Sequence, residues 1–222
     1  MSALSQRRYF FYLSGCNLAD CYLAYDIQSS KTTLFIPPID PDDVIWSGLP
    51  VSIDDALAKY DVDEVKYSTD VNSTLSSFAS ANPNSSIFAI EHQISDHVSL
   101  SDFKNKDLKV LKKSIETARV VKDEYEVALI RKANHISGLA HKAVVQRAKT
   151  ATNEQEFEAT FLERCVAHGA KEMAYHPILA AGTAAATLHY VDNNAPLEGK
   201  TNLLIDAGAE WSNYASDIVR IP

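Results

Sequence analysis

The segment between residues 122 and 148 constrains the fold more than any other part of the chain. Its apolar residues recur at the intervals of a single helical face, and they are Tyr125, Leu129, Ile136, Ala140 and Ala143. Asp123 and Glu124 stand near its start, where carboxylates interact favourably with the positive end of a helix dipole. The pattern therefore predicts one long helix from about Lys122 to Ala148.

A second helix is predicted from about Asn153 to His168. Thr152 and Gln155 have the spacing of a capping box, and Gly169 suits the position that follows a helix. The side chains expected to face the core are Phe157, Phe161 and Val166. Beyond Gly169 the pattern predicts strands, which cover residues 178–180, 187–190, 202–205 and 211–219.

The first half of the chain alternates short apolar runs with short helical patterns. The runs that predict strands are 9–13, 21–26, 34–36, 65–67 and 87–90. Helices are predicted over 54–60, with Ser52 as N-cap, and over 75–79. This alternation indicates an α/β domain whose strands are mostly covered. Lysines cluster between Lys104 and Lys113, which is typical of a solvated connector, so we expect two domains, 1–110 and 111–222.

Composition and charge exclude several classes of protein. Hydrophobic residues are 46% and charged residues 23% of the 222 positions, an ordinary globular mixture rather than a disordered or fibrous one. The net charge of −8 disfavours nucleic acid and anionic membranes as partners, since both need a cationic surface. No apolar stretch approaches the roughly 20 residues that span a bilayer, and the short run after Arg7-Arg8 is not expected to be a signal peptide.

The three cysteines predict reduced thiols. Cys16, Cys21 and Cys165 are too few for a disulfide framework and match no zinc spacing. This usage indicates a cytoplasmic protein.

Two aspartates are the candidate metal ligands. Asp206 directly ends the apolar run 202–205, and a charge there is costly to bury unless it is paired or bound to metal. Asp217 follows eleven residues later, and pairing of 203–206 with 214–219 would bring both carboxylates to one point. Mn²⁺ and Mg²⁺ prefer such oxygen ligands. The plainer interpretation is one aspartate that starts a turn and a second, exposed one on the next strand.

His189 is the candidate for proton transfer or substrate binding. It lies on an apolar stretch seventeen residues before Asp206. A hydrogen-bonded core or rim histidine is the alternative, and His176 is equally ambiguous. The chain lacks a phosphate-loop motif, a dinucleotide fingerprint and a Gly-x-Ser-x-Gly nucleophile elbow.

Four motifs together carry a family resemblance. They are Tyr175–Gly182 (YHPILAAG), Thr187–Tyr190 (TLHY), Leu204–Glu210 (LIDAGAE) and Tyr214–Ile218 (YASDI). They resemble the pita-bread metallopeptidases, and above all the prolidases and Xaa-Pro aminopeptidases of fungal type. The helix opening at Val121–Glu126 is similar to the start of that family's catalytic domain, and Asp20–Asp26 resembles its N-terminal domain.

The resemblance implies a fold, a reaction and residue roles. The fold would be α/β (α+β): an incomplete creatinase-type N-terminal α/β domain, followed by the first half of a pita-bread catalytic domain. The family hydrolyses the peptide bond before proline with two divalent ions, most often Mn²⁺. Asp206 and Asp217 would then be metal ligands and His189 the catalytic histidine. A homodimer is also implied, because the family is commonly dimeric.

This chain departs from the family pattern at both ends. Compared with the family, its N-terminal domain lacks the first strands and helix. The resemblance implies five metal ligands, of which the last three follow well after the second aspartate, whereas this sequence ends five residues after Asp217. We therefore expect a chain truncated at both ends that has little or no activity by itself. The alternative is a non-catalytic module that binds a peptide or a partner chain.

Overall fold

The computed structural model describes residues 4–222, with side chains from residue 8 onward. This part of the chain forms two compact units, Met1–Val121 and Lys122–Pro222. The boundary expected from the sequence, near residue 110, falls at the start of helix α5 (Val110–Ala118), which belongs to the first unit. The division between the units lies after this helix, between Val121 and Lys122.

The first unit opens with a helix where the sequence predicted a strand. Residues 9–13 lie within α1 (Leu4–Ser14), so the strand prediction for this run was wrong. Five consecutive apolar residues have no period of their own, and tertiary packing decides such a run. Phe10 packs against the core of this unit, and the helix ends where Gly15 (φ +65°) donates its N–H to the Phe11 carbonyl.

A three-stranded sheet forms the centre of the first unit. β1 (Tyr22–Asp26) pairs antiparallel with β2 (Lys31–Ile36), and β2 pairs parallel with β3 (Glu64–Tyr67). The parallel pair needs a crossover, which α2 (Pro41–Ser47) and α3 (Ile53–Lys59) supply. Ser52 caps α3 through the Asp55 amide, as predicted. Leu34 and Ile36 pack on the side of α1 and α3, and alternation along the strand turns Phe35 to the opposite face.

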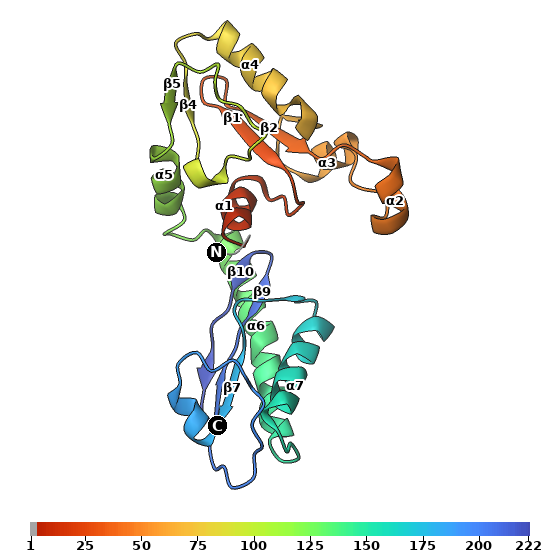
Figure 1. Cartoon of the computed structure of the whole chain (residues 1–222), viewed down its shortest axis with the longest axis vertical. Coiled ribbons are helices and arrows are strands. Elements are labelled where there is room, and N and C mark those ends of the chain that lie inside the picture. Colours follow the sequence, from red (N-terminus) through yellow and green to blue (C-terminus); the bar gives the residue numbers. More distant parts are fainter. Residues whose placement is uncertain (1–3) are drawn as a thin grey trace. The chain divides into compact units, whose positions relative to one another are not determined.

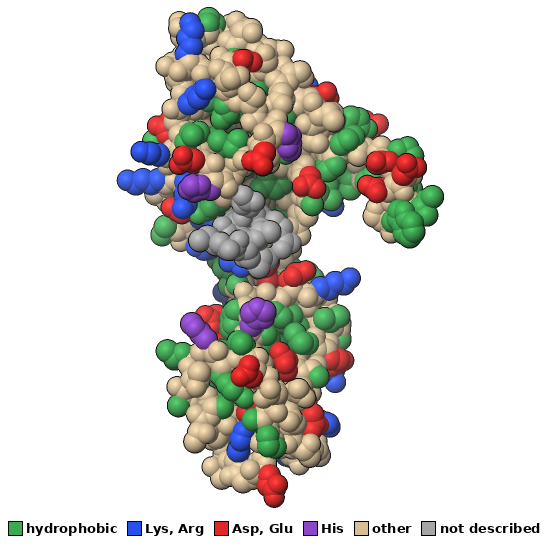
Figure 2. Space-filling view, viewed as in Figure 1, with side chains coloured by type: hydrophobic (Ala, Val, Ile, Leu, Met, Phe, Trp, Pro, Cys, Tyr) green, Lys and Arg blue, Asp and Glu red, His purple; other side chains and the backbone are tan. Residues whose placement is uncertain are grey.

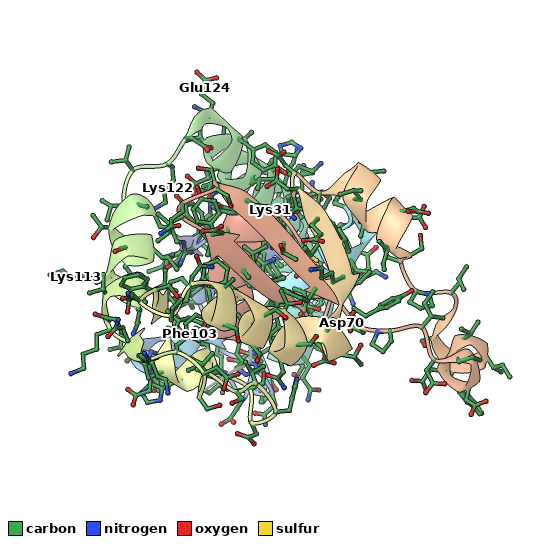
Figure 3. All side chains as sticks on the ribbon, turned by 90° about the horizontal axis from the view of Figure 1, so that it is seen from above. Lys31, Asp70, Phe103, Lys113, Lys122 and Glu124 are labelled. Atoms are coloured by element: carbon green, nitrogen blue, oxygen red, sulfur yellow. The ribbon has the colours of Figure 1, made fainter. Side chains whose placement is uncertain are left out.

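A second group of elements completes this unit. α4 (Val71–Ala81) runs alongside the sheet, and Phe103 stacks on its Phe78 at 6.3 Å between ring centroids (Figure 3). β4 (Ser86–Phe88) pairs parallel with β5 (Asn105–Asp107), and the short 3₁₀ turn η2 (Glu91–Gln93) lies between them along the chain. Another 3₁₀ turn, η1 (Ser68–Asp70), links β3 to α4. The lysine-rich stretch 104–113 is therefore not a connector. It holds β5 and the start of α5.

Helix α2 exposes apolar side chains. Ile45 and Trp46 are 84% and 86% exposed, and Figure 2 shows apolar and acidic side chains side by side in this region. Across residues 4–222, no helix combines the length and the hydrophobicity that a membrane span needs.

The second unit begins with the two predicted helices, which lie side by side (Figure 1). α6 (Glu124–Arg147) starts with a complete capping box formed by Asp123 and Glu126. α7 (Glu154–Ala167) is capped by Asn153 and not by Thr152, because the Asn153 side chain accepts from the Gln155 amide.

The buried faces of these helices match the predicted ones in part. Leu129, Ile136, Ala140, Phe157 and Phe161 are buried, as the periodicity predicts. Val166 was wrongly expected to face the core, since it lies near the end of α7 and is about half exposed, and Tyr125, on the predicted apolar face of α6, is exposed as well.

Two small antiparallel sheets complete this unit. One has the order β10 (Tyr214–Ala215), β9 (Ala209–Trp211), β6 (Glu172–Met173). The other has the order β11 (Val219–Arg220), β8 (Leu203–Asp206), β7 (Ile178–Ala181). The strand predicted over 187–190 does not form. A 3₁₀ helix, η3 (Gly182–Ala186), precedes these residues, and a turn occupies 188–189.

Candidate functional site

Asp206 is fixed by the central strand of its sheet. β8 hydrogen-bonds on both sides, so Asp206 faces Ile178 of β7 and Val219 of β11. Its neighbours Ile205 and Ala207 are fully buried, whereas Asp206 itself keeps part of its surface. The carboxylate therefore ends an ordered apolar strand at a position that solvent reaches.

The backbone between the two aspartates folds back on itself. The Ala207 amide donates to the Ile218 carbonyl at 3.1 Å, and the Ser216 amide donates to the Ala209 carbonyl at 3.0 Å. Gly208 makes this approach feasible, since a Cβ atom there would lie 2.0 Å from the Ser216 carbonyl oxygen. Eleven residues of chain thus return Asp217 to the neighbourhood of Asp206.

A single hydroxyl group joins the two carboxylates. Tyr175 Oη donates to Asp206 Oδ1 at 2.6 Å and lies 3.0 Å from Asp217 Oδ1. Burial and then the two negative charges raise the pKa of Tyr175 above its usual value, so the hydroxyl keeps its proton. The predicted convergence of Asp206 and Asp217 is present, and the sequence reasoning gave Tyr175 no separate role in it. The strand pairing that brings the two aspartates together involves fewer residues than the predicted pairing of 203–206 with 214–219. Only 219–220 pair with β8, and 214–215 pair with β9.

Helix α6 holds this turn from the other side. The Ser137 and Ser216 hydroxyls lie 2.6 Å apart, and Ser137 Oγ accepts from the Ala209 amide at 2.8 Å. His141, one turn further along α6, hydrogen-bonds the Ala207 carbonyl through Nε2 at 2.9 Å and stands edge-on to Phe161. Burial lowers the pKa of His141, which favours the neutral ring. Ser137 and His141 thus attach the turn between Asp206 and Asp217 to helix α6.

His189 lies in an exposed turn after η3. Among the residues that the structure describes, no hydrogen bond or ion pair joins it to Asp206 or Asp217. The structure therefore unites the two aspartates and leaves the histidine outside their hydrogen-bonded group. His176 is likewise exposed.

The segment that carries His189 is anchored by a buried glutamate. Glu154 Oε2 accepts from the Tyr190 hydroxyl at 2.7 Å and from the Ala195 amide at 3.0 Å. Its Oε1 accepts from the Ala181 amide at 2.8 Å and lies 3.3 Å from Lys200 Nζ. Burial by itself raises the pKa of Glu154, but these donors outweigh it and the pKa is lowered. Sequence reasoning missed this group, because an acidic residue in a first helical turn is ordinary.

Asn193 makes a second anchor in the same segment. Its Oδ1 accepts from the Leu179 amide and its Nδ2 donates to the Pro177 carbonyl, both at 2.8 Å. Asn193 is fully buried and has φ 43°, a backbone conformation that asparagine tolerates better than most residues. The two anchors tie the 182–200 segment to β7.

The carboxylate pair offers the type of ligand that a hard divalent cation prefers, but fewer ligands than such a cation takes. Two carboxylates that converge on one point offer the oxygen ligands such ions prefer. Within residues 4–222, no group of three or more His, Cys, Asp or Glu side chains is arranged to hold a metal ion. Asp206 and Asp217 thus make a partial ligand set.

Each of the two units matches a known protein family. Residues 3–88 match the aminopeptidase P N-terminal domain, and residues 128–221 match metallopeptidase family M24. The chain is 73% identical over 215 residues to a Metarhizium acridum protein named "Probable Xaa-Pro aminopeptidase pepP", with 97% of this chain and 43% of that protein covered. A protein from Fusarium vanettenii that is also named as a probable Xaa-Pro aminopeptidase is 68% identical over 215 residues, with 97% of this chain and 46% of that protein covered.

Solved structures agree with this assignment. Proline aminopeptidase P II from Yersinia pestis superposes with a TM-score of 0.81 at 26% identity, covering 96% of this chain and 52% of that one. Aminopeptidase P from Escherichia coli has the same fold, with a TM-score of 0.82 at 22% identity and the same coverage.

These matches extend over nearly the whole chain and over about half the length of each relative. The mixed α/β architecture agrees with them. The chain therefore joins a region that matches the aminopeptidase P N-terminal domain to a region that matches metallopeptidase family M24, and the relatives described above are named as probable Xaa-Pro aminopeptidases.

Proposed function

We propose that this chain carries part of a metal-dependent site that hydrolyses the peptide bond before proline, in Xaa-Pro dipeptides or at the N-terminus of Xaa-Pro peptides. The observation that supports it most is the convergence of Asp206 and Asp217 on one hydroxyl inside the M24 region. The names of the relatives supply the substrate class.

In this proposal Asp206 and Asp217 hold the metal, most often Mn²⁺. Divalent ions supply an activated water and polarise the scissile carbonyl when they are bound. The chain's own residues orient those ligands: β8 fixes Asp206, the turn at Gly208 returns Asp217, and the Tyr175 hydroxyl hydrogen-bonds both carboxylates. His189, exposed on an anchored segment, is the proposed group that binds substrate and transfers a proton.

The chain by itself is proposed to be inactive. A hard divalent ion takes about six oxygen ligands, and the described residues bring two carboxylates together. Two carboxylates are too few for a dinuclear site. A homodimer and a cytoplasmic location, both expected from the sequence and the resemblance, belong to the same proposal.

Hydrolysis of Gly-Pro and of a Gly-Pro-containing tripeptide by the purified chain tests the activity, with and without Mn²⁺. We expect no release of glycine while circular dichroism shows a folded protein. Metal-dependent release at the rate of a complete enzyme would contradict the proposed inactivity, and the preferred peptide would separate dipeptidase from aminopeptidase.

Metal binding tests the ligands independently of turnover. We expect calorimetry to detect weak Mn²⁺ binding that is reduced at least tenfold in Asp206→Asn and in Asp217→Asn. Asp192→Asn is the matched control, because this exposed aspartate lies in the same unit and outside the pair. Equal binding by all four proteins would favour the non-catalytic alternative.

A further inference from the structure

Two buried polar side chains of α6 face the turn that joins the candidate metal ligands. Ser137 is fully buried and His141 is 1% exposed, so both find their hydrogen bonds inside the protein. They lie one helical turn apart, which places them on the same face of α6. We infer that Ser137 and His141 are positioning residues, which hold the two ends of this turn and thereby set how tightly Asp206 and Asp217 bind a divalent cation. The inference rests on the proposed function.

His141 holds the end of the turn that begins at Asp206. Its Nε2 lies 2.9 Å from the carbonyl oxygen of Ala207, the residue that follows Asp206. A carbonyl oxygen only accepts, so the ring carries its proton on Nε2 and donates it. Phe161 of α7 stands edge-on to the ring, at 5.5 Å between centroids, and restricts its rotation. Within residues 8–222, whose side chains the structure describes, Nδ1 has no hydrogen-bond partner, so the ring acts through its bond to Ala207.

Ser137 holds the end of the turn that leads into Asp217. Its Oγ accepts from the Ala209 amide at 2.8 Å and lies 2.6 Å from the Ser216 hydroxyl. The Ser216 hydroxyl donates its own proton to the Ala209 carbonyl at 3.0 Å, so Ser137 is the donor between the two serines. Ser216 directly precedes Asp217, and its amide also donates to the Ala209 carbonyl. A single hydroxyl on α6 therefore fixes both strands of backbone at this end.

These contacts hold the backbone on both sides of Asp217. Ser216 precedes it and is held by Ser137, while the Ile218 carbonyl follows it and accepts from the Ala207 amide at 3.1 Å. Ala207 is the residue that His141 holds, so both routes lead to α6. Two carboxylates repel each other, and a fixed spacing between them has to come from the surrounding backbone.

The spacing matters for metal binding because it exists before the ion arrives. Asp206 and Asp217 fit a hard divalent cation in chemistry, since their oxygens converge on one hydroxyl. Ligands that are already in place need no ordering when the ion binds. Groups that orient metal ligands without touching the metal typically change its affinity by about 10- to 100-fold. Ser137 and His141 act one step further back, through the backbone, so we expect an effect at the low end of this range.

Titration of the full chain with Mn²⁺, followed by electron paramagnetic resonance of the free ion, tests the inference. We expect His141→Leu and Ser137→Ala each to bind Mn²⁺ about tenfold more weakly than the parent, although both aspartates are present. His141→Gln should bind nearly as the parent does, because its amide nitrogen can donate to the Ala207 carbonyl in place of Nε2. Circular dichroism checks that each variant is folded. Ser137→Ala removes a single oxygen atom, so it decides the question if His141→Leu does not fold.

Val144→Ala is the matched control for a general loss of stability. Val144 is fully buried on the same helix and packs in the hydrophobic core of the second unit. Its truncation should lower the free energy of unfolding and leave the affinity for Mn²⁺ unchanged. An equal loss of affinity in Val144→Ala and Ser137→Ala would overturn the inference. Unchanged binding by Ser137→Ala and His141→Leu, or binding by His141→Gln as weak as that of His141→Leu, would overturn it too.

Asp206→Asn separates this inference from the proposed function. If the parent does not bind Mn²⁺, or if Asp206→Asn binds it as tightly as the parent does, the aspartates are not metal ligands and both proposals fail. If Asp206→Asn weakens binding while Ser137→Ala and His141→Leu do not, the proposed metal ligands stand and the positioning role alone is wrong.

Discussion

At the scale of single residues, Glu154 is the most demanding position in the second unit. It is fully buried, and each of its two carboxylate oxygens accepts hydrogen bonds from two donors. A buried charge stays ionised only when its donors replace the lost water, and these donors come from the segment 181–200. The carboxylate therefore stabilises the strand end and the loop that carries His189.

We expect Glu154→Gln to lower the free energy of unfolding by about 2–4 kcal/mol, because an amide leaves Lys200 without its buried counter-charge and places an NH₂ group against donors. Urea denaturation followed by circular dichroism measures it. Glu163→Gln is the matched control on the same helix, since its side chain is exposed and pairs with the exposed Arg164, and it should change stability by less than about 0.5 kcal/mol. Similar losses in both variants would contradict this role.

The same residue predicts a pH dependence. The pKa of Glu154 is lowered in the folded state, so its contribution to stability is fully present above the unfolded value of about 4.3. That contribution is lost as the pH falls through the folded pKa. We expect the stability difference between the parent and Glu154→Gln to shrink as urea midpoints are taken from pH 6 toward about pH 3. A difference that stays constant would show that Glu154 acts through packing and not through its charge.

At the scale of elements, the carboxylate pair depends on a turn between strands β8 and β11. The backbone at Gly208 lies so close to the backbone at Ser216 that no side chain fits at position 208, because a Cβ atom there would lie 2.7 Å from the Ser216 carbonyl carbon. Ser137 of helix α6 hydrogen-bonds the Ala209 amide and the Ser216 hydroxyl, on the two sides of this turn. The distance between Asp206 and Asp217 is thus set by backbone packing, and Tyr175 bridges a pair that is already placed.

Two glycine-to-alanine substitutions test this. Gly208→Ala should lower the free energy of unfolding by at least about 2 kcal/mol, because the methyl group meets rigid backbone. Gly138→Ala should raise it by about 0.5–1 kcal/mol, since Gly138 lies inside α6 and nothing stands within 4 Å of its added Cβ. Thermal or urea denaturation of both variants compares them. A tolerated Gly208→Ala would mean that the turn can open, and the separation of the aspartates would then be adjustable.

At the scale of the whole molecule, the chain consists of two units with separate hydrophobic cores. One core contains Leu34, Ile36 and Val65, and the other contains Ile136, Phe161 and Ile205. A unit with its own core can fold by itself, and the boundary between two such units is the place where few contacts cross. The stretch between α5 and α6 has this character, since Val120 and Val121 are 71% and 80% exposed.

Limited proteolysis with trypsin should therefore cut first after Arg119 or Lys122. The lysine-rich stretch 104–113 is the internal comparison. It would be cleaved first if it were a connector, but β5 and α5 protect its backbone. We expect mass spectrometry of the earliest fragments to identify pieces that end at Arg119 or Lys122, or that begin at Val120 or Asp123. Early cleavage after Lys106 or Lys109 would contradict the division observed here.

Local patterns in the sequence determined much of this architecture. The period of the apolar residues predicts α6 and α7, and the cap at Ser52 predicts α3, because helix faces and caps involve residues within a few positions of each other. The Asp206–Asp217 convergence was also foreseen, since a turn between neighbouring strands is nearly local.

Tertiary structure alone decided the rest. The run 9–13 became a helix, because an aperiodic apolar run takes the conformation that its packing partners favour. Glu154 became a buried anchor through donors 27 to 46 residues away along the chain, and no local pattern records such distances. Where His189 lies relative to the carboxylates depends on that same long-range anchoring. Periodicity reports which face of an element is buried, whereas the satisfaction of a buried charge depends on which distant segments the fold brings to it.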